Sequence, residues 1–552
     1  MEYPKIPLAQ SILQICQAKG VTRIVISPGS RNAPLTIGFA SNPAFECYSI
    51  ADERCAAFFA LGLAQQLKAP VAVVCTSGSA VLNYYPAVAE AFYSQIPLVV
   101  ISADRPVDKI DIGDGQTIRQ QNVMKSHTVY CANLTEEASL ENDLKINKAI
   151  NRAVWKKGPV HINAPFEEPL YETVSKYAVD AMIEGKPQRE KRLTVQEIMA
   201  ATNVWNVAKR KLILVGSLEP GDISHEVIRS WAADPSVIVM TEVTSNLHDP
   251  SFASRIDTMI TAFSPKDFRD FRPDVLITIG GMVVSKRVKS FLRGYKPEQH
   301  WHIDKLRAYD TFGALTNHFK VDADYFFKAI APFAKPVKSN YAAKAASILA
   351  YRETRHEDFS ASAPYSDFYA YREVLSALPD HIQLQISNSA AIRYAQLFNV
   401  RETIEVYCNR GTSGIDGSTS TAIGASLLSG KQTVLITGDI GFFYDSNALW
   451  NNYVPGNFRI IIINNSGGGI FRILPGHAET PLFNKFFETS HNLNARNLAQ
   501  MFGFEYRSAS GEKEIASQLS GFFDGNQKAI LEIFTPEKEN DSVLKNYFTA
   551  LG

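Results

Sequence analysis

The 552-residue chain carries 56 basic and 56 acidic residues, so its formal charges cancel, and 45% of its residues are apolar. Such a chain is too long for a single core, and its balanced charge excludes the global positive field that gathers nucleic acid or anionic membranes. Its apolar runs, such as RIIIIN, are far shorter than the roughly 20 residues that a membrane helix requires.

The opening residues, MEYPKIPLAQSILQ, lack the basic and then apolar segments of a secretory signal. The cysteines show no C-x-x-C and no paired spacing, which is typical of proteins in a reducing compartment. These features predict a cytoplasmic protein with structural cysteines.

Short runs rich in Val, Ile and Leu recur along the chain, each followed by a helical pattern. Runs without alternation fit strands that are buried on both faces of a parallel sheet. The first group contains TRIVISPGS, VAVVCTSGS, PLVVISADRP and GPVHINAPF; the second contains KLILVGSLEPGD, SVIVMTEVTS, DVLITIGGM and QHWHIDKL; the third contains IQLQISNSA, IEVYCNRGTSG, TVLITGDIG, RIIIINNSGGG and KAILEIFTP. The predicted fold class is therefore α/β, with three doubly wound parallel-sheet domains.

Polar stretches near residues 178–195 and 335–365 separate these groups, and the second stretch is partly helical in pattern. We place the domains at residues 1–180, 190–340 and 360–552. Ligands of open α/β sheets bind outside the carboxyl ends of the strands. The residues that directly follow each strand are therefore the candidates for a functional site.

An acidic pair, Asp52 and Glu53, precedes the apolar stretch CAAFFALGL with only Arg54 between them. The pair can occupy the first turn of a helix, where carboxylates meet the positive end of the helix dipole. A carboxylate in such apolar surroundings can equally have a functional partner, because it is costly to bury alone. This stretch alone leaves both interpretations open.

The stretch ITGDIGFFYDSNALWNNYVPGNFRIIIINNSGGGIF contains the strongest chemical signal. One predicted strand ends at Gly438-Asp439 and the next ends at Asn464-Asn465, so a carboxylate and an amide oxygen would lie on adjacent strand ends. Such hard oxygen ligands suit Mg²⁺, which also binds ligand phosphates, and the glycines that follow allow close backbone approach. The alternative is an aspartate that caps a helix and an asparagine pair that satisfies a turn.

Arginines form the second candidate constellation. Arg31, Arg105, Arg393 and Arg410 lie at or near predicted strand ends of the first and third groups. An isolated surface arginine usually serves solubility, but several at facing strand ends suggest a substrate with more than one carboxylate, since guanidinium groups bind carboxylates bidentately.

Other enzyme classes leave no comparable signature. The histidines show no metal-ligand spacing, and G-x-S-x-G is absent, so hydrolysis is not favoured. A nucleotide-binding oxidoreductase or regulatory module would use the same sheets, but it predicts a G-x-G-x-x-G turn, and no convincing one is present.

The pairing of G-D with N-N about 25 residues later resembles the thiamine-diphosphate signature of the decarboxylase and carboligase superfamily. Further segments resemble, in order and spacing, one family of that superfamily, the 2-succinyl-5-enolpyruvyl-6-hydroxy-3-cyclohexene-1-carboxylate synthases of menaquinone biosynthesis. They are SPGSRNAPL, DERCAAFFALGLA, TSGSAVLNYYPAVAEA, ADRP, GQTIRQ, NRGTSGIDG and GGGIFRILP. The resemblance covers the whole chain and implies pyrimidine-binding, central and diphosphate-binding domains in that order.

The resemblance also implies the residues of the site. Mg²⁺, or alternatively Mn²⁺, would be held by Asp439, Asn465 and Gly467, and thiamine diphosphate would contact Glu53, Ser389, Ser413, Gly414, Ile415, Gly438 and Asp439. The implied substrate contacts are Ser30, Arg31, Arg105, Gln116, Lys286, Arg393, Arg410, Ile470, Phe471 and Leu474, of which Arg31, Gln116, Arg393 and Arg410 join Glu53 as catalytic candidates. Ile440 replaces the third glycine of the usual G-D-G, and Gly115 stands where a relative has asparagine.

The implied reaction is decarboxylation of 2-oxoglutarate and 1,4-addition of the resulting succinyl carbanion to isochorismate. The family's pyrimidine and diphosphate domains meet across a subunit boundary, so a homodimer is expected, with a homotetramer as the alternative. Glu53 would then serve cofactor held by Asp439 of another chain. An acetohydroxyacid synthase-like enzyme is the runner-up within the superfamily; the arginine set and the lack of an obvious flavin motif count against it.

Overall fold

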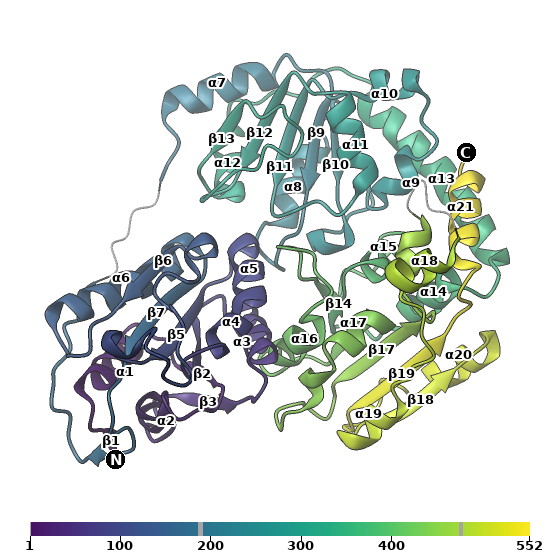
Figure 1. Cartoon of the computed structure of the whole chain (residues 1–552). Helices are drawn as coiled ribbons and strands as arrows, with labels where there is room; N and C mark the ends of the chain where they lie inside the picture. The colour runs from purple at the N-terminus through teal and green to yellow at the C-terminus, as the bar shows by residue number, and fades with distance from the viewer. Residues whose placement is uncertain (1, 186–190, 474–478) are drawn as a thin grey trace.

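Three parallel sheets, each flanked by helices, follow one another along the chain (Figure 1). The structure is a computed structural model that describes residues 2–185, 191–473 and 479–552. In Figure 1 the first domain, in purple and blue, lies beside the third, in green and yellow, and the second, in teal, lies above both. The predicted fold class is confirmed.

The first sheet has the order β3-β2-β4-β5-β7-β6, and all its neighbours are parallel. Its strands are β2 (Arg23–Ile26), β3 (Glu46–Ser49), β4 (Val71–Cys75), β5 (Leu98–Asp104), β6 (Tyr130–Asn133) and β7 (Val160–Pro165). The helices are α1 (Pro7–Ala18), α2 (Ala33–Ala40), α3 (Glu53–Leu67), α4 (Ala80–Asn83), α5 (Tyr85–Ser94) and α6 (Leu140–Lys156), with short 3₁₀ turns at Val107–Lys109 and Lys125–His127. A small antiparallel pair joins β1 (Tyr3–Pro4) to β8 (Thr173–Val174).

The second sheet has the order β10-β9-β11-β12-β13. Its strands are β9 (Lys211–Val215), β10 (Val237–Met240), β11 (Val275–Ile279), β12 (Gln299–Ile303) and β13 (Asn317–Phe319). Around them lie α7 (Val195–Trp205), α8 (His225–Ala232), η3 (Val243–Ser245), α9 (Ile256–Ile260), α10 (Pro265–Phe271), α11 (Lys286–Gly294) and α12 (Ala323–Ile330). The long helix α13 (Tyr341–Ser362) then leads to the third domain, within the stretch predicted to be a partly helical linker.

The third sheet has the order β15-β14-β16-β17-β19-β18, which repeats the strand order of the first. Its strands are β14 (Gln383–Ile386), β15 (Glu405–Tyr407), β16 (Thr433–Gly438), β17 (Arg459–Asn464), β18 (Glu505–Ala509) and β19 (Ala529–Phe534). The helices are α14 (Asp367–Ala377), α15 (Ala390–Ala395), α16 (Ser418–Ser426), α17 (Asp439–Tyr444), α18 (Pro481–Phe483), α19 (Arg496–Met501), α20 (Glu512–Leu519) and α21 (Asn540–Ala550), with 3₁₀ turns η4 (Ser446–Leu449) and η5 (Gly469–Ile473) and a π-helical turn η6 (Asn484–Glu488).

The first and third domains share a hydrophobic core, because α3 packs directly against α16. A Cβ atom at Gly424 of α16 would overlap the backbone carbonyl of Phe59 on α3, so the close approach requires glycine there. The two sheets therefore present the carboxyl ends of their strands in a fixed relationship within one chain.

The described residues include no helix long and apolar enough to cross a membrane. All six cysteines are free thiols, and four of them are buried.

Candidate thiamine-diphosphate site

The register of the third sheet brings the predicted metal ligands together. Gly438 of β16 lies opposite Ile463 of β17, so Asp439 and Asn465 follow adjacent strand ends. Both side chains are buried, and the backbone N–H of Gly467 donates to Asp439 Oδ2 at 2.9 Å. The Asp439 carboxylate, the Asn465 amide and the Gly467 backbone therefore meet at one point of the sheet edge.

The Asn465 amide has a defined orientation. Its Nδ2 donates to Asp367 Oδ2 at 2.9 Å, while its Oδ1 is buried and accepts no hydrogen bond from the described residues. Burial and the nearby Asp439 raise the pKa of Asp367 to about 6. An unpartnered amide oxygen beside a carboxylate is the donor set that Mg²⁺ requires, and leaving it unpaired costs on the order of 1–3 kcal/mol. The residues present therefore fit a divalent cation.

The glycine loop after β17 is shaped by close backbone contacts. Gly467 has φ +156°, and a Cβ atom there would lie 2.8 Å from the Glu488 carbonyl, which also accepts from the Gly468 N–H at 2.6 Å. Arg472 pairs with the buried Glu488 carboxylate and holds η5 against this segment. The predicted contacts Ile470 and Phe471 lie on η5, whereas Leu474 lies outside the described residues.

Two serines near the cavity have left-handed backbone conformations. Ser389, which precedes α15, has φ +68°, and Ser413 has φ +62°. For non-glycine residues such conformations cost on the order of 1–3 kcal/mol and cluster at functional sites. Asn388 donates to the Gly414 carbonyl at 2.7 Å, so the Ser389 and Ser413 turns are tied together at neighbouring strand ends.

A cavity of about 150 Å³ lies at this edge of the third sheet. Its walls include eight of the predicted residues: Ser389, Ile415, Gly438, Asp439, Asn465, Gly467, Ile470 and Phe471. Every residue that lines it within the described parts of the chain comes from the third domain. A second cavity, of about 840 Å³ between α13 and β10, is lined by none of the predicted site residues.

The basic residues at the third domain's sheet edge lie beside this cavity. Arg410 donates to Asn388 Oδ1 at 2.6 Å, and Asn388 itself lines the cavity. Burial and the neighbouring Arg410 lower the pKa of Arg393. Two guanidinium groups so close to each other favour an anionic ligand. The predicted Lys286, by contrast, is exposed at the start of α11.

The first domain gathers its predicted residues around the turn that follows β4. The Arg31 N–H donates to Thr76 Oγ1 at 3.2 Å, and the backbone of Gln116 lies next to Gly78. Burial, and after it the charge of Glu53, raise the pKa of the Cys75 thiol. Arg31, Glu53 and Gln116 thus surround one sheet edge.

The arginines of the first domain already have partners in this domain. Arg31 is buried and donates to the Phe166 carbonyl at 3.0 Å and to Glu168 at 3.1 Å. Arg105 pairs with Asp114 at 3.2 Å. Ser30 and Gln116 are exposed at the same edge.

Glu53 is the first residue of α3, and Asp52 is its N-cap, since Asp52 Oδ1 accepts from the Cys55 N–H at 3.1 Å. The helix-start interpretation is therefore confirmed. Asn83 donates to Glu53 Oε2 at 3.3 Å. Both neighbours of Glu53 are bound to the third domain: Asn447 of η4 donates to Asp52 at 2.8 Å, and Arg54 donates to the carbonyl of Tyr444, the last residue of α17, at 2.7 Å. Glu53 is thus held in place without an ion pair to any residue that the structure describes.

Sequence reasoning missed two acidic residues that organise the site. Asp367 orients Asn465, and Glu90 of α5 accepts hydrogen bonds from the Gly411 and Thr412 N–H groups beside Ser413, each at 2.6 Å. Both side chains lie far along the chain from their hydrogen-bond partners, so no local sequence motif predicts these contacts. The buried position of Glu90 within the helix AEAF was the available signal.

Family models match all three domains. Residues 6–127 match the thiamine pyrophosphate enzyme N-terminal TPP binding domain, residues 182–384 match the middle domain of thiamine pyrophosphate enzymes, and residues 388–533 match the C-terminal TPP binding domain.

Curated relatives are similar over the full length of the chain. Proteins named 2-succinyl-5-enolpyruvyl-6-hydroxy-3-cyclohexene-1-carboxylate synthase are 62% identical in Flavobacterium psychrophilum and 60% identical in Flavobacterium johnsoniae, with 100% of both chains covered in each comparison. The protein of that name from Christiangramia forsetii is 51% identical, with 99% of each chain covered.

Proposed function

The chain belongs to the family of 2-succinyl-5-enolpyruvyl-6-hydroxy-3-cyclohexene-1-carboxylate synthases, and we propose that it joins 2-oxoglutarate to isochorismate with loss of CO₂. The observation that best supports a cofactor-bound site is the buried Asn465 Oδ1, which has no hydrogen-bond partner among the described residues and lines the same cavity as the Asp439 carboxylate. The neighbouring pair Arg393 and Arg410 supports acidic substrates.

Asp439, Asn465 and the Gly467 carbonyl would hold Mg²⁺ or Mn²⁺ against the cofactor diphosphate. Ser389, Ser413 and Gly414 would offer hydroxyl and backbone N–H donors to the same diphosphate, and Gly438 and Ile415 would line the cofactor cavity. Bound thiamine diphosphate supplies the carbon nucleophile and the electron sink for decarboxylation. The chain itself binds, orients and desolvates the reacting groups.

Each proposed substrate carries two carboxylates, which the arginines can bind. Arg393 and Arg410 would bind them at the third-domain edge, and Arg31 and Arg105 would do so at the first-domain edge, where Ser30 and Gln116 add exposed polar groups. Ile470, Phe471 and Leu474 would cover the apolar parts of the substrates, and Lys286 would approach from the central domain.

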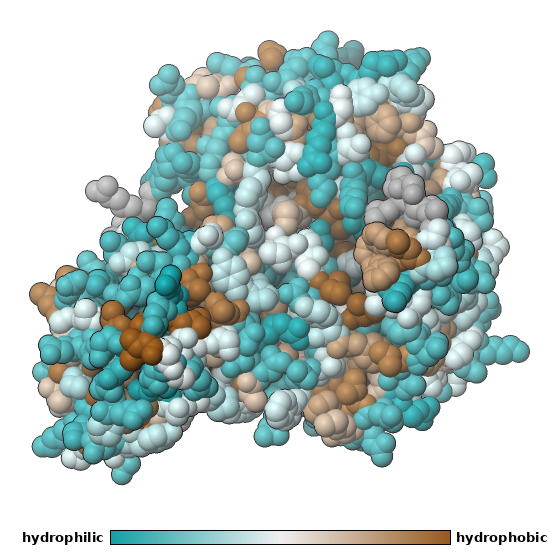
Figure 2. All heavy atoms as spheres, in the orientation of Figure 1, coloured by the Kyte–Doolittle hydropathy of each residue, from teal (hydrophilic) through white to brown (hydrophobic). Residues whose placement is uncertain are grey.

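The two edges would meet in a homodimer. The third-domain cavity, about 150 Å³, is smaller than the roughly 300–1,000 Å³ of complete ligand sites, as expected of half a site. Large apolar side chains are exposed beside both halves, at Val107 and Ile112 after Arg105 and at Phe486 and Phe487 near Phe471. Figure 2 shows hydrophobic patches over both the first and the third domain on the face that it draws. Glu53 of one chain would then hold and move a proton at the cofactor bound by its partner.

The overall reaction is tested with apoprotein, by following CO₂ release from 2-oxoglutarate. We expect release only with thiamine diphosphate, a divalent cation and isochorismate together. CO₂ release at the same rate with and without isochorismate would indicate a simple decarboxylase. A preference for joining two pyruvate molecules would indicate an acetohydroxyacid synthase-like enzyme. Release without thiamine diphosphate contradicts the proposal.

The shared site is tested by mixing two inactive chains, Glu53→Gln and Asp439→Asn. In a mixed dimer with shared sites, one site carries both substitutions and the other carries neither, so about a quarter of wild-type activity returns after random mixing. If each site is built from one chain, every site is defective and activity stays at the level of the separate variants.

A further inference from the structure

The segment Thr241–Asn246 of the central domain contacts the start of α11 through a buried carboxylate. Glu242 accepts hydrogen bonds from the backbone N–H groups of Val284 and Ser285, both at 2.7 Å. Ser285 is the N-cap of α11 and accepts from the Val288 N–H at 2.9 Å. The Glu242 carboxylate therefore fixes the point from which α11 departs.

The same segment also forms hydrogen bonds with the elements that position Arg393 and Arg410. The Val243 N–H donates to Gln396 Oε1 at 3.1 Å, and Gln396 directly follows α15, which carries Arg393. Asn246 exchanges two hydrogen bonds of 2.8 Å with the Val406 backbone of β15, the strand that precedes Arg410. One short segment thus sets the relative positions of α11, α15 and β15.

Lys289 of α11 lies within the electrostatic reach of this basic pair. Its side chain is half-buried, and its Nζ donates to the Val283 carbonyl at 2.9 Å. Burial, followed by the charges of Arg410, Arg293 and Arg393, lowers the pKa of Lys289, while Glu242 raises it. Three cations at a partly buried site repel one another, so this arrangement favours binding of an acidic ligand.

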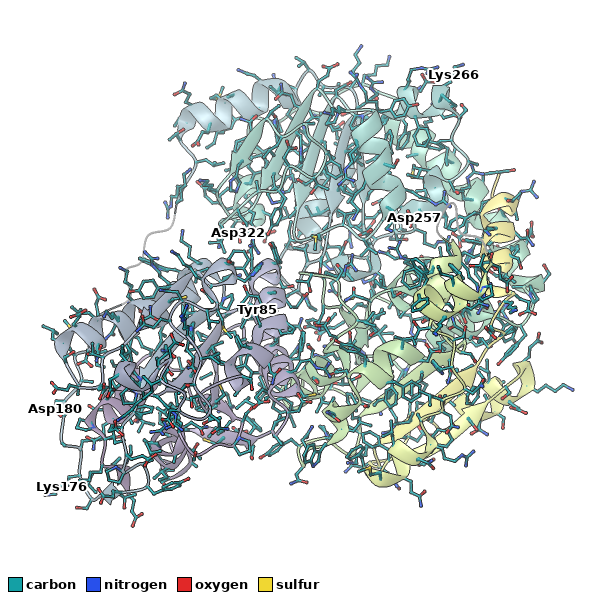
Figure 3. The ribbon with its side chains drawn as sticks, in the orientation of Figure 1. Tyr85, Lys176, Asp180, Asp257, Lys266 and Asp322 are labelled. Atoms are coloured by element: carbon teal, nitrogen blue, oxygen red, sulfur yellow. The ribbon has the colours of Figure 1, made fainter. Side chains whose placement is uncertain are left out.

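The acidic groups on the central-domain side do not neutralise these cations fully. Asp257 is held by a hydrogen bond from Ser285, and burial raises its pKa. Figure 3 shows Asp257 at the edge of the central domain that faces the third domain. Burial likewise raises the pKa of Glu242 to about 7. Lys289, Arg393 and Arg410 therefore keep an excess of positive charge.

We propose that Lys289 is the third cation of the substrate-carboxylate site, beside Arg393 and Arg410, and that Glu242 is the positioning residue that holds it there. This inference rests on the proposed function. The ammonium group of Lys289 has three donors, of which one contacts Val283, so two remain for a carboxylate. The ligand class is a dicarboxylate or a larger polycarboxylate.

The first test replaces the charge of Lys289. Lys289→Met should raise KM for at least one of the two acidic substrates by about 10- to 100-fold, since a charged hydrogen bond is lost, with a smaller change in kcat. Lys289→Arg should recover most of the affinity. The matched control is Lys266→Met, an exposed central-domain lysine shown in Figure 3, which should leave KM unchanged.

A binding readout independent of turnover uses glutarate, a non-reacting dicarboxylate, titrated calorimetrically into holoenzyme. Its Kd should rise by about 10-fold or more in Lys289→Met and stay unchanged in Lys266→Met. A change of less than twofold in both KM and glutarate Kd for Lys289→Met overturns the role of Lys289. Absence of thiamine-dependent turnover in the wild type overturns the proposed function instead.

The Glu242→Gln variant distinguishes a positioning role of Glu242 from a purely electrostatic effect of its charge. Removing a negative charge beside three cations should by itself tighten anion binding and lower KM. The glutamine amide offers only one acceptor to two N–H groups, so loss of positioning should instead raise KM by about 3- to 10-fold with cofactor affinity unchanged. A lowered or unchanged KM overturns the positioning role. If the Glu242→Gln protein does not fold, Glu242→Asp is a second variant that keeps both acceptor oxygens.

Discussion

The Glu90 carboxylate of the first domain caps the Gly411 N–H of the third domain at 2.6 Å. Its second oxygen accepts from the Thr412 N–H at 2.6 Å and from the Thr412 hydroxyl at 2.8 Å. The loop that carries Ser413 and Gly414 is therefore shaped by a side chain more than 300 positions earlier in the same chain. The proposed diphosphate contacts thus depend on how the first and third domains pack.

Glu90→Gln should weaken thiamine diphosphate binding on the order of 10-fold, since an amide cannot accept from both N–H groups and the Thr412 hydroxyl as the carboxylate does. The measurement is the apparent Kd of thiamine diphosphate from fluorescence or activation titrations at saturating Mg²⁺. The control is Glu141→Gln, which removes an exposed carboxylate paired with Lys145 on α6 and should leave this Kd unchanged. Equal affinities in both variants would contradict the role of Glu90.

Asp367→Asn should weaken metal binding through Asn465. The carboxylate accepts a hydrogen bond from Asn465 Nδ2 and so fixes the orientation of this amide, and loss of such an orienting partner typically costs about 10- to 100-fold in metal affinity. The apparent Kd of Mg²⁺ or Mn²⁺ is measured at constant thiamine diphosphate. Asp380→Asn, which removes an exposed third-domain carboxylate paired with Arg401, is the control. An unchanged metal affinity in Asp367→Asn would show that Asn465 needs no fixed partner.

The sequence patterns predicted every central strand of the three large sheets and also two edge strands, β10 and β15, whereas the four strands of these sheets that they missed, β3, β6, β13 and β18, all lie at sheet edges. Central strands such as β4 are buried at every residue, which produces the continuous apolar run VAVVC. Edge strands such as β18 (EYRSA) are only partly buried and carry charges, so their sequence shows no such run. The missing signal is therefore a direct consequence of exposure.

From the sequence, only those site residues that directly follow strands could be predicted to lie together. Asp439 and Asn465 follow buried strands, and the parallel register brings them together without further information. Asp367, Glu90 and Glu242 act across gaps of 98, 321 and 42 residues, and each lies in a helix or loop without a distinctive motif. Such contacts depend on domain packing, which a single sequence does not encode in any local pattern.

Glu53→Gln should retain thiamine diphosphate affinity and folding but lose about 100- to 10,000-fold in kcat, the range typical of a lost acid–base group. The geometry supports intact folding, because the N-cap is Asp52 and the contacts with η4 and α17 are made by Asp52 and Arg54, not by Glu53. Steady-state kcat and the cofactor Kd are measured together. The exposed Glu136→Gln in the same domain should behave as wild type, and near-wild-type kcat in Glu53→Gln rules out the proton-transfer role.

His161 of β7 should make the first domain sensitive to acid. Burial lowers the pKa of His161 from its ordinary value of about 6.5 to about 4, and its Nε2 forms a hydrogen bond of 2.7 Å with Ser102 Oγ. Since the unfolded chain binds the proton more readily, stability is fully present above pH 6.5 and is lost as the pH falls toward 4. Between pH 7.5 and pH 5 the loss from this group is about 2 kcal/mol.

His161→Gln removes that titration, so its deficit in the free energy of unfolding relative to wild type should shrink by about 2 kcal/mol between pH 7.5 and pH 5. Urea unfolding at the two pH values measures the difference, and comparison with wild type cancels the opposing contributions of buried acids such as Asp445, whose pKa burial raises to about 6. The exposed His381→Gln should show the same difference from wild type at both pH values. A deficit of His161→Gln that stays constant with pH would mean that His161 is protonated equally well in the folded and unfolded chain.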